Sequence, residues 1–223
     1  MDVRVRNDDP SAMVSLATGL LLGLLLGVRH ALEPDHLAAV STMITRRGSP
    51  AAGAVLGAFW GLGHSLALFV VGCVLAALDA RLPPRLADGF ELLVSIMLIA
   101  LGARAIARAR RSGEAHDLAP GRSHLGRQPL VVGLVHGLAG SGALTALALA
   151  SLPTVATRLL YIALFGAGSV LGMAGLTGVA GWPLARMRAG GPILRRLSVA
   201  TGTFSVLLGL GWGWSVARGM LAA

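Results

Sequence analysis

The 223-residue chain contains no lysine, one cysteine and one tyrosine, and only 13% of its residues are charged. A soluble domain carries roughly 25% charged residues, so this composition argues against a large soluble domain. The lone Cys73 excludes a disulfide framework and a CxxC redox pair. All basic residues are arginines, and they lie between apolar segments without interleaved aromatics. This pattern favours loop charge on a membrane protein and disfavours nucleic-acid binding.

Apolar runs of about 20 residues, the length that crosses a bilayer core, recur along the whole chain. We therefore predict an all-α polytopic membrane protein that forms a single transmembrane domain over residues 1–223, with about six transmembrane helices. No signal peptide is expected, because "MDVRVRNDDP" has mixed charge and no cleavage site follows the first apolar run. The predicted spans are 12–32, 52–78, 89–110, 129–151, 155–183 and 197–219.

Arginines are densest in the loops after the first, third and fifth spans. By the positive-inside rule these loops face the cytoplasm, and both termini then lie outside.

The first apolar region continues beyond its span to about Ile44, and a straight helix over 12–44 would be about 50 Å long. This exceeds the hydrocarbon thickness, so we expect a break, a strong tilt or a re-entry. Within this region lies "RHALEPDH", Arg29–His36, the most polar stretch of an otherwise apolar segment. Pro34 has no N–H, which predicts a kink that leaves the carbonyl of His30 unpaired and available as a backbone oxygen.

The two halves of the chain are weakly similar to each other. "LLGVRHALEPDHLAAVS" resembles "VVGLVHGLAGSGALTAL", with His30 on His136, and "WGLGHSLAL" resembles "FGAGSVLGM", with Ser65 on Ser169. Each half has three spans, and an odd number inverts the second half in the membrane. This predicts a 3+3 inverted repeat of the kind found in secondary transporters. The first repeat covers 11–110, a cytoplasmic linker covers 111–128, and the second repeat covers 129–219.

Ionisable residues inside a membrane segment are costly and are candidates for function. Glu33 and Asp35 are the only acidic residues predicted within an apolar segment, and the other acidic residues are expected in tails, loops or span ends. Four of the six histidines lie in spans or at their edges. Divalent transition metals are bound by imidazole and carboxylate in a protected pocket. Arg29 and Glu33 are four residues apart and could form an ion pair. The predicted metal ligands are His30, Asp35, His36 and His64, and possible further ligands or supporting residues are Arg29, Glu33, Ser65, His136 and Ser141.

Two other interpretations of these polar residues are weaker. The cluster could be an interfacial helix end with snorkelling histidines, but this does not explain the histidines of other spans. A zinc protease is disfavoured, because the HExxH motif needs histidines four apart. The stretch "SGEAHDLAPGRSHLGRQ", with His116, Asp117 and His124, is more typical of a solvated linker than of a metal-transfer site.

At these residues the sequence resembles the nickel/cobalt transporter family, and is similar to its UreH-like urease-accessory group. The family pattern is RHAxDADH, and this chain matches it at His30, Asp35 and His36. Glu33 stands at the first aspartate of the pattern and Pro34 at its alanine. The "GHS" of the next span matches a second family element. Typical members have eight spans and later acidic motifs, where this chain reads "HGLAGSGAL".

The resemblance implies a metal permease whose histidine–aspartate motif selects and binds the ion. We predict a non-enzymatic Ni²⁺ or Co²⁺ uptake permease of the bacterial inner membrane. It has no prosthetic group, because the metal is the transported substrate. Its other partners would be the bilayer and nickel-enzyme maturation proteins, with no nucleic acid. The alternatives are a metal exporter and a non-transporting accessory protein for urease or hydrogenase maturation. A thiol-reductase-type electron carrier is disfavoured by the lone Cys73.

Overall fold

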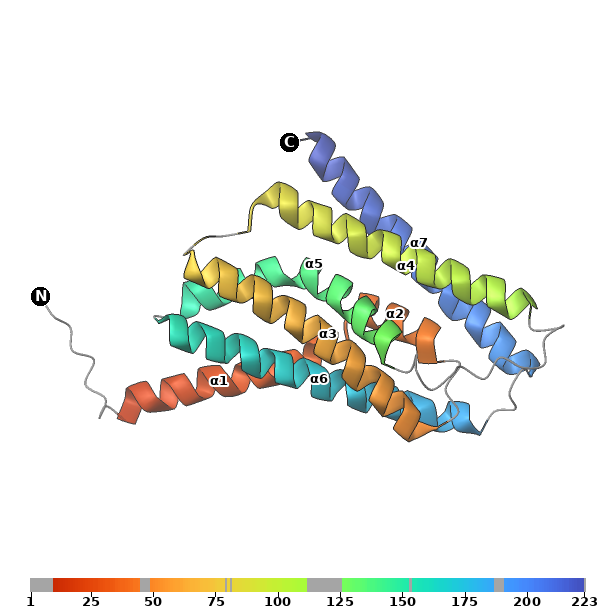
Figure 1. The fold of residues 1–223 in the computed structure, drawn as a ribbon, viewed down its shortest axis with the longest axis horizontal. Helices are drawn as coiled ribbons and strands as arrows, with labels where there is room; N and C mark the ends of the chain where they lie inside the picture. The colour runs from red at the N-terminus through yellow and green to blue at the C-terminus, as the bar shows by residue number, and fades with distance from the viewer. Residues whose placement is uncertain are drawn as a thin grey trace, which may run out of the picture.

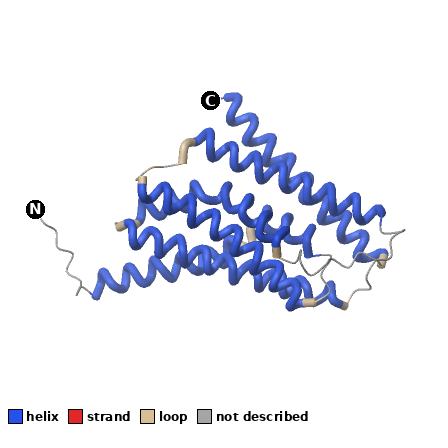
Figure 2. Tube along the Cα trace, viewed as in Figure 1, coloured by secondary structure: helices blue, strands red, loops and turns tan. Residues whose placement is uncertain are grey.

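The computed structural model describes residues 10–44, 49–78, 80, 82–111, 126–152, 154–186 and 191–222. Within these residues every regular element is an α-helix, which confirms the all-α prediction (Figures 1 and 2). In chain order the helices are α1 (Pro10–His30), α2 (Pro34–Ile44), α3 (Pro50–Ala77), α4 (Pro84–Arg111), α5 (Arg127–Ser151), α6 (Val155–Ala185) and α7 (Pro192–Ala222).

Six of these helices lie over the six predicted spans, and α2 is the additional one. The predicted break in the first apolar region is present as a turn over residues 31–33. Pro34 does not kink a continuous helix there. It is the first residue of α2, where its missing N–H has no helical partner to lose and its fixed φ favours helix initiation.

Four of the described helices are long and apolar enough to cross a membrane: α3, α4, α6 and α7. A shorter apolar stretch, Ala17–His30, lies in α1. Large apolar side chains are exposed on the outside of the helices, including Leu171, Val179 and Trp214 at 63%, 74% and 68%. Such an apolar exterior is expected where lipid, and not water, surrounds the protein.

Helix α3 packs between α5 and α6, and α1 packs against the other side of α6. Helices α4 and α7 lie along each other as a pair beside this group, and the short α2 contacts both of them (Figure 1). Trp60, Leu98 and Met173, from α3, α4 and α6, are completely buried in the main core. The interior is thus formed where the helix group, the α4–α7 pair and α2 meet.

Glycines allow the helix backbones to approach closely. Several of these contacts occur in matched pairs, in which a glycine of one half of the chain has a counterpart in the other half. A Cβ atom at Gly27 of α1 would overlap the carbonyl oxygen of Phe165 in α6, and one at Gly133 of α5 would overlap that of Trp60 in α3. Small residues are what helices need to pack closely in lipid. Further matched pairs are Gly168 on Leu24 with Gly63 on Leu130, Gly61 on Val170 with Gly166 on Ser65, and Gly102 on Gly202 with Gly209 on Ser95.

The matched contacts also refine the sequence comparison of the two halves. Gly27 lies against the backbone nitrogen of Ser169, and Gly133 lies against that of His64. In these contacts Ser169 of α6 corresponds to His64 of α3, which differs by one residue from the pairing with Ser65 that the sequence comparison gives.

We expect Gly27→Ala to lower the free energy of unfolding by about 1–3 kcal/mol, because the new methyl group meets the backbone of α6. Gly19→Ala in the same helix is the matched control. Its Cβ atom would have no neighbour within 4 Å, so the gain in helix propensity should leave stability equal or slightly higher. The melting temperature of the detergent-solubilised protein, followed by size exclusion, measures both. Equal melting temperatures for the two variants would contradict this packing.

Candidate metal site

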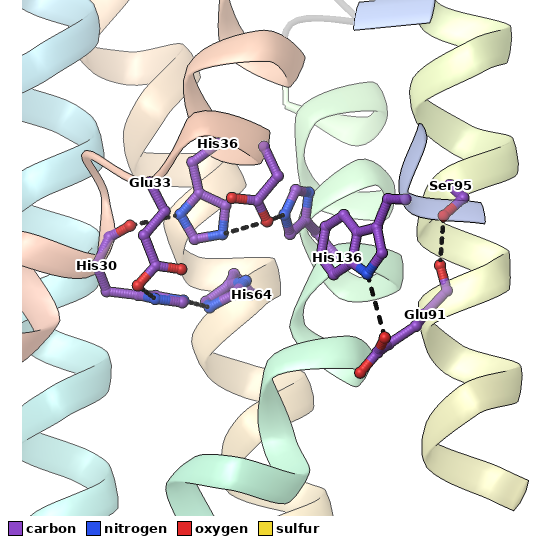
Figure 3. Close-up of polar contacts among 9 residues, drawn as sticks. His30, Glu33, His36, His64, Glu91, Ser95 and His136 are labelled. Atoms are coloured by element: carbon purple, nitrogen blue, oxygen red, sulfur yellow. Dashed lines mark hydrogen bonds and ion pairs between the residues drawn. The ribbon is translucent and has the colours of Figure 1, made fainter. Parts of the chain in front are cut away.

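The structure brings together the histidines of four different helices. His30 ends α1, His36 lies in the first turn of α2, His64 lies within α3 and His136 lies within α5. The ring of His36 is central, with centroids 4.4 Å from His30, 5.0 Å from His64 and 4.4 Å from His136 (Figure 3). Residues that are far apart in the sequence thus form one polar cluster inside an apolar helix bundle.

Most of the cluster is buried, and the exposure of its side chains increases from His36 and His64 to Glu33. His36 and His64 are fully buried and His136 is 2% exposed. The side chains of His30 and Asp35 are 15% and 13% exposed, and that of Glu33 is 53% exposed. Buried polar groups are costly unless they are paired or bind an ion. This concentration of imidazole and carboxylate is therefore a candidate site for an ion.

The orientation of His36 is set by the break between α1 and α2. Its Nδ1 lies 2.8 Å from the carbonyl oxygen of His30, and because a carbonyl only accepts, Nδ1 carries the proton and donates. The lone pair is therefore on Nε2, which is buried and has no hydrogen-bond partner. The carboxylate oxygen Oδ2 of Asp35 lies 3.8 Å from it. A buried imidazole nitrogen with a free lone pair beside a carboxylate has the chemistry of a metal ligand.

Among the described residues, two groups of three side chains have ligand atoms that all lie within 4.8 Å of one another. We call them the three-histidine group, which is His30, His36 and His64, and the aspartate group, which is Asp35, His36 and His136. In the first, Nε2 of His30 lies 3.1 Å from Nε2 of His64. In the second, Nε2 of His136 lies 2.7 Å from Oδ2 of Asp35. All four predicted ligands thus lie in the cluster, and His136 joins them.

Glu33 and Arg29 are arranged differently from the expected ion pair. The Glu33 carboxylate lies 3.0 Å from Nδ1 of His30, so among the described contacts its partner is His30, and Arg29 is exposed. If Nδ1 of His30 donates to Glu33, the lone pair of His30 is on Nε2, toward His64. The expected free carbonyl of His30 is also taken, because it accepts from the His36 ring and from the Glu33 N–H.

The remaining predicted residues lie apart from the two groups or outside the description. Ser65 donates its hydroxyl to the carbonyl of Gly166, at 2.8 Å, and so joins α3 to α6. Ser141 lies in α5, outside the residues whose side chains are described. The loop residues His116, Asp117 and His124 also lie outside the described residues.

Two residues beside the cluster do not stand out in the sequence analysis. Trp60 is fully buried, and its ring centroid lies 5.4 Å from that of His36. Its position one helical turn before His64 could have indicated from the sequence that it lies near the cluster. Glu91, expected at the end of a span, lies inside α4, because this helix begins at Pro84 and the predicted span begins at residue 89. Its carboxylate accepts from Nε1 of Trp212 at 3.1 Å (Figure 3).

The fold and the site together define a multi-pass helical membrane protein with a buried histidine–aspartate cluster. A family model described as NicO, high-affinity nickel-transport protein, matches residues 16–106, which include the motif and α3. The chain is 34% identical over 183 residues to the urease accessory protein UreH of Bacillus sp. (strain TB-90), covering 76% of this chain and 79% of that protein. The chain belongs to the NicO nickel-transport family, which confirms the family resemblance and a non-enzymatic role.

Two plant proteins are more distant relatives. The chloroplast proteins FOR GROWTH AND FERTILITY 1 and 2 of Arabidopsis thaliana are each 27% identical to this chain, over 213 and 172 residues. The matches cover 87% and 72% of this chain but only 58% and 46% of the plant proteins. No solved structure matches the chain significantly.

Ser65→Ala tests whether the Ser65 hydroxyl is a packing group or part of the site. Loss of its bond to Gly166 should lower the free energy of unfolding by about 1 kcal/mol and leave the dissociation constant for nickel unchanged. Ser205→Ala is the matched control, because the Ser205 hydroxyl donates to the Leu98 carbonyl between α7 and α4. Weaker nickel binding by the Ser65 variant at unchanged stability would place the hydroxyl in the metal site.

Proposed function

We propose that this chain is a nickel permease and that the buried cluster binds the transported ion. The observation that carries the proposal is that His36, the residue shared by the two ligand groups, is fully buried and has no hydrogen-bond partner for its Nε2. His30, Asp35, His36 and His64 are the proposed ligands, and His136 is a fifth. Cobalt is a second proposed substrate, because Co²⁺ takes the same imidazole and carboxylate ligands.

The charge of the site supports transport in preference to permanent storage of the ion. Asp35 is the only carboxylate in the two ligand groups, and the other members are imidazoles. A transported ion must bind well enough to lose its water and weakly enough to leave again. One anionic ligand among neutral ones fits that requirement. Glu33, more exposed and paired with His30, is proposed to orient this ring and to attract the cation to the edge of the cluster.

The matched glycine contacts support a 3+3 inverted repeat, with repeats over 11–110 and 129–219 and a linker over 111–128. Helices α1, α3 and α4 of the first half correspond to α5, α6 and α7 of the second in these contacts. The cluster draws its histidines from both halves. We propose alternating access in which the two repeats move relative to each other around the cluster, as in other inverted-repeat carriers.

We propose uptake across the bacterial inner membrane as the direction and place of transport. The similarity to a protein named for urease accessory function supports delivery of nickel toward enzyme-maturation proteins. That similarity also makes a non-transporting accessory protein the second candidate. An exporter is the third, since the ligand set itself has no direction.

Nickel accumulation in cells at submicromolar metal separates these candidates. We expect His36→Gln and Asp35→Asn to lower accumulation to the level of cells without the protein, because each removes a buried ligand. Glu33→Gln is the matched carboxylate control. It should retain transport with a several-fold higher half-saturating concentration, because exposed ion pairs contribute at most about 1 kcal/mol. Higher accumulation in the His36 variant than in wild type would indicate export.

The orientation can be tested with single cysteines introduced into a Cys73→Ser background. We expect a membrane-impermeant maleimide to label Leu78→Cys, after α3, in intact cells. Arg186→Cys, after α6, should be labelled only in permeabilised cells, because the arginine-rich loops face the cytoplasm. The reverse labelling pattern would invert the topology, and labelling of both from outside would contradict the span assignment.

A further inference from the structure

We propose that the cluster holds one nickel ion in either of two overlapping positions, and that transport passes the ion between them on His36. The first position is the three-histidine group and the second is the aspartate group. This inference rests on the proposed function and adds to it a defined path for the ion within the site.

The two groups share one residue, and that residue offers one ligand atom. Nδ1 of His36 is occupied by its bond to the His30 carbonyl, so Nε2 is the atom available to either group. His30 and His136 lie on opposite sides of the His36 ring (Figure 3). An ion bound by one group therefore excludes an ion from the other. Because His36 belongs to both groups, the ion can move from one to the other without losing all its protein ligands.

The ligands that change during this transfer are not equivalent. Leaving the three-histidine group, the ion would release the neutral imidazoles of His30 and His64. Entering the aspartate group, it would gain one imidazole and the Asp35 carboxylate. The carboxylate attracts a cation that the imidazoles only coordinate. The two positions thus differ in charge and in ligand atoms, which makes them distinguishable by spectroscopy.

Each group also has one side chain that is partly exposed at the surface of the cluster. Only one member of the three-histidine group is partly exposed, which is His30 at 15%. Only one member of the aspartate group is partly exposed, which is Asp35 at 13%. The other members are 0–2% exposed. The two positions therefore each have a member at the edge of the cluster, as two ends of one path require.

The matched helix contacts relate a histidine of the first position to a histidine of the second. Gly27 and Gly133 occupy corresponding places against α6 and α3, and His30 and His136 each follow three residues later in the sequence. His30 of the first position thus corresponds to His136 of the second. In alternating access, each half adopts in turn the conformation of the other. Such a motion would bring the ion next to His30 in one state and next to His136 in the other.

The test uses the purified full chain in detergent, with nickel as the probe. Nickel binding is measured by equilibrium dialysis, and the bound ion is examined by nickel K-edge X-ray absorption, which reports the number of imidazole ligands. His136→Gln removes only the second position, His64→Gln only the first, and His36→Gln both. Ser205→Ala, a buried hydroxyl at the α4–α7 contact, is the control for general loss of packing.

We expect the wild-type chain to bind one nickel ion. His64→Gln and His136→Gln should each still bind one, with a dissociation constant raised less than about tenfold, because the other position remains. Nickel in His136→Gln should have three imidazole ligands, and nickel in His64→Gln two imidazoles and an oxygen. Both variants should transport nickel into cells at less than about a tenth of the wild-type rate, although they bind it. His36→Gln should not bind, and Ser205→Ala should match wild type.

Three results would overturn the two-position path. Loss of binding in His136→Gln or in His64→Gln would mean one site that needs all its ligands. Wild-type transport by His136→Gln would remove the second position from the path. Identical absorption spectra for the two variants would mean the same ligands in both. If His136→Gln does not fold, Asp35→Asn removes the second position and is held to the same expectations. Failure of the proposed function is distinct, because the wild-type chain itself would then not transport nickel, whether or not it binds the ion.

Discussion

The hydrogen bond from Nδ1 of His36 to the carbonyl of His30 is the contact on which the whole cluster depends. It exists because the chain leaves one helix at His30 and begins another at Pro34, so that two residues six apart face each other. The bond uses the backbone oxygen that the break frees, fixes the proton of His36 and leaves its Nε2 without a hydrogen-bond partner in the interior. A continuous helix would have pointed the two rings in different directions.

Close backbone packing brings the remaining ligands to this point. Gly133 and Gly137 of α5 lie against the backbone of α3 at Trp60 and His64, which leaves no space for a side chain between the two helices. This contact places the rings of His64 and His136 5.9 Å apart, and they lie 5.0 and 4.4 Å from the ring of His36. Small residues thus serve the site indirectly, since in lipid they determine how near polar side chains on separate helices can come.

Much of this arrangement could be predicted from local sequence. Apolar run length identified all the helices but α2, the excess length of the first apolar region required a break, and the motif identified residues that the structure brings into one cluster. What local sequence could not give was tertiary in origin. The partner of Glu33 is His30 and not Arg29, and Trp60 and Glu91 lie beside the cluster only because α3 and α4 converge on α2. The correspondence of Ser169 with His64 likewise required the helix contacts.

The central claim is that this chain alone moves nickel through the cluster. The most direct test is nickel entry into liposomes that contain only the purified protein, followed with a trapped metal-sensitive dye. We expect nickel to enter liposomes with the wild-type chain faster than protein-free liposomes, and liposomes with His36→Gln no faster than protein-free ones. Wild-type liposomes that bind nickel without admitting it would contradict transport and leave the cluster as a binding site of an accessory protein.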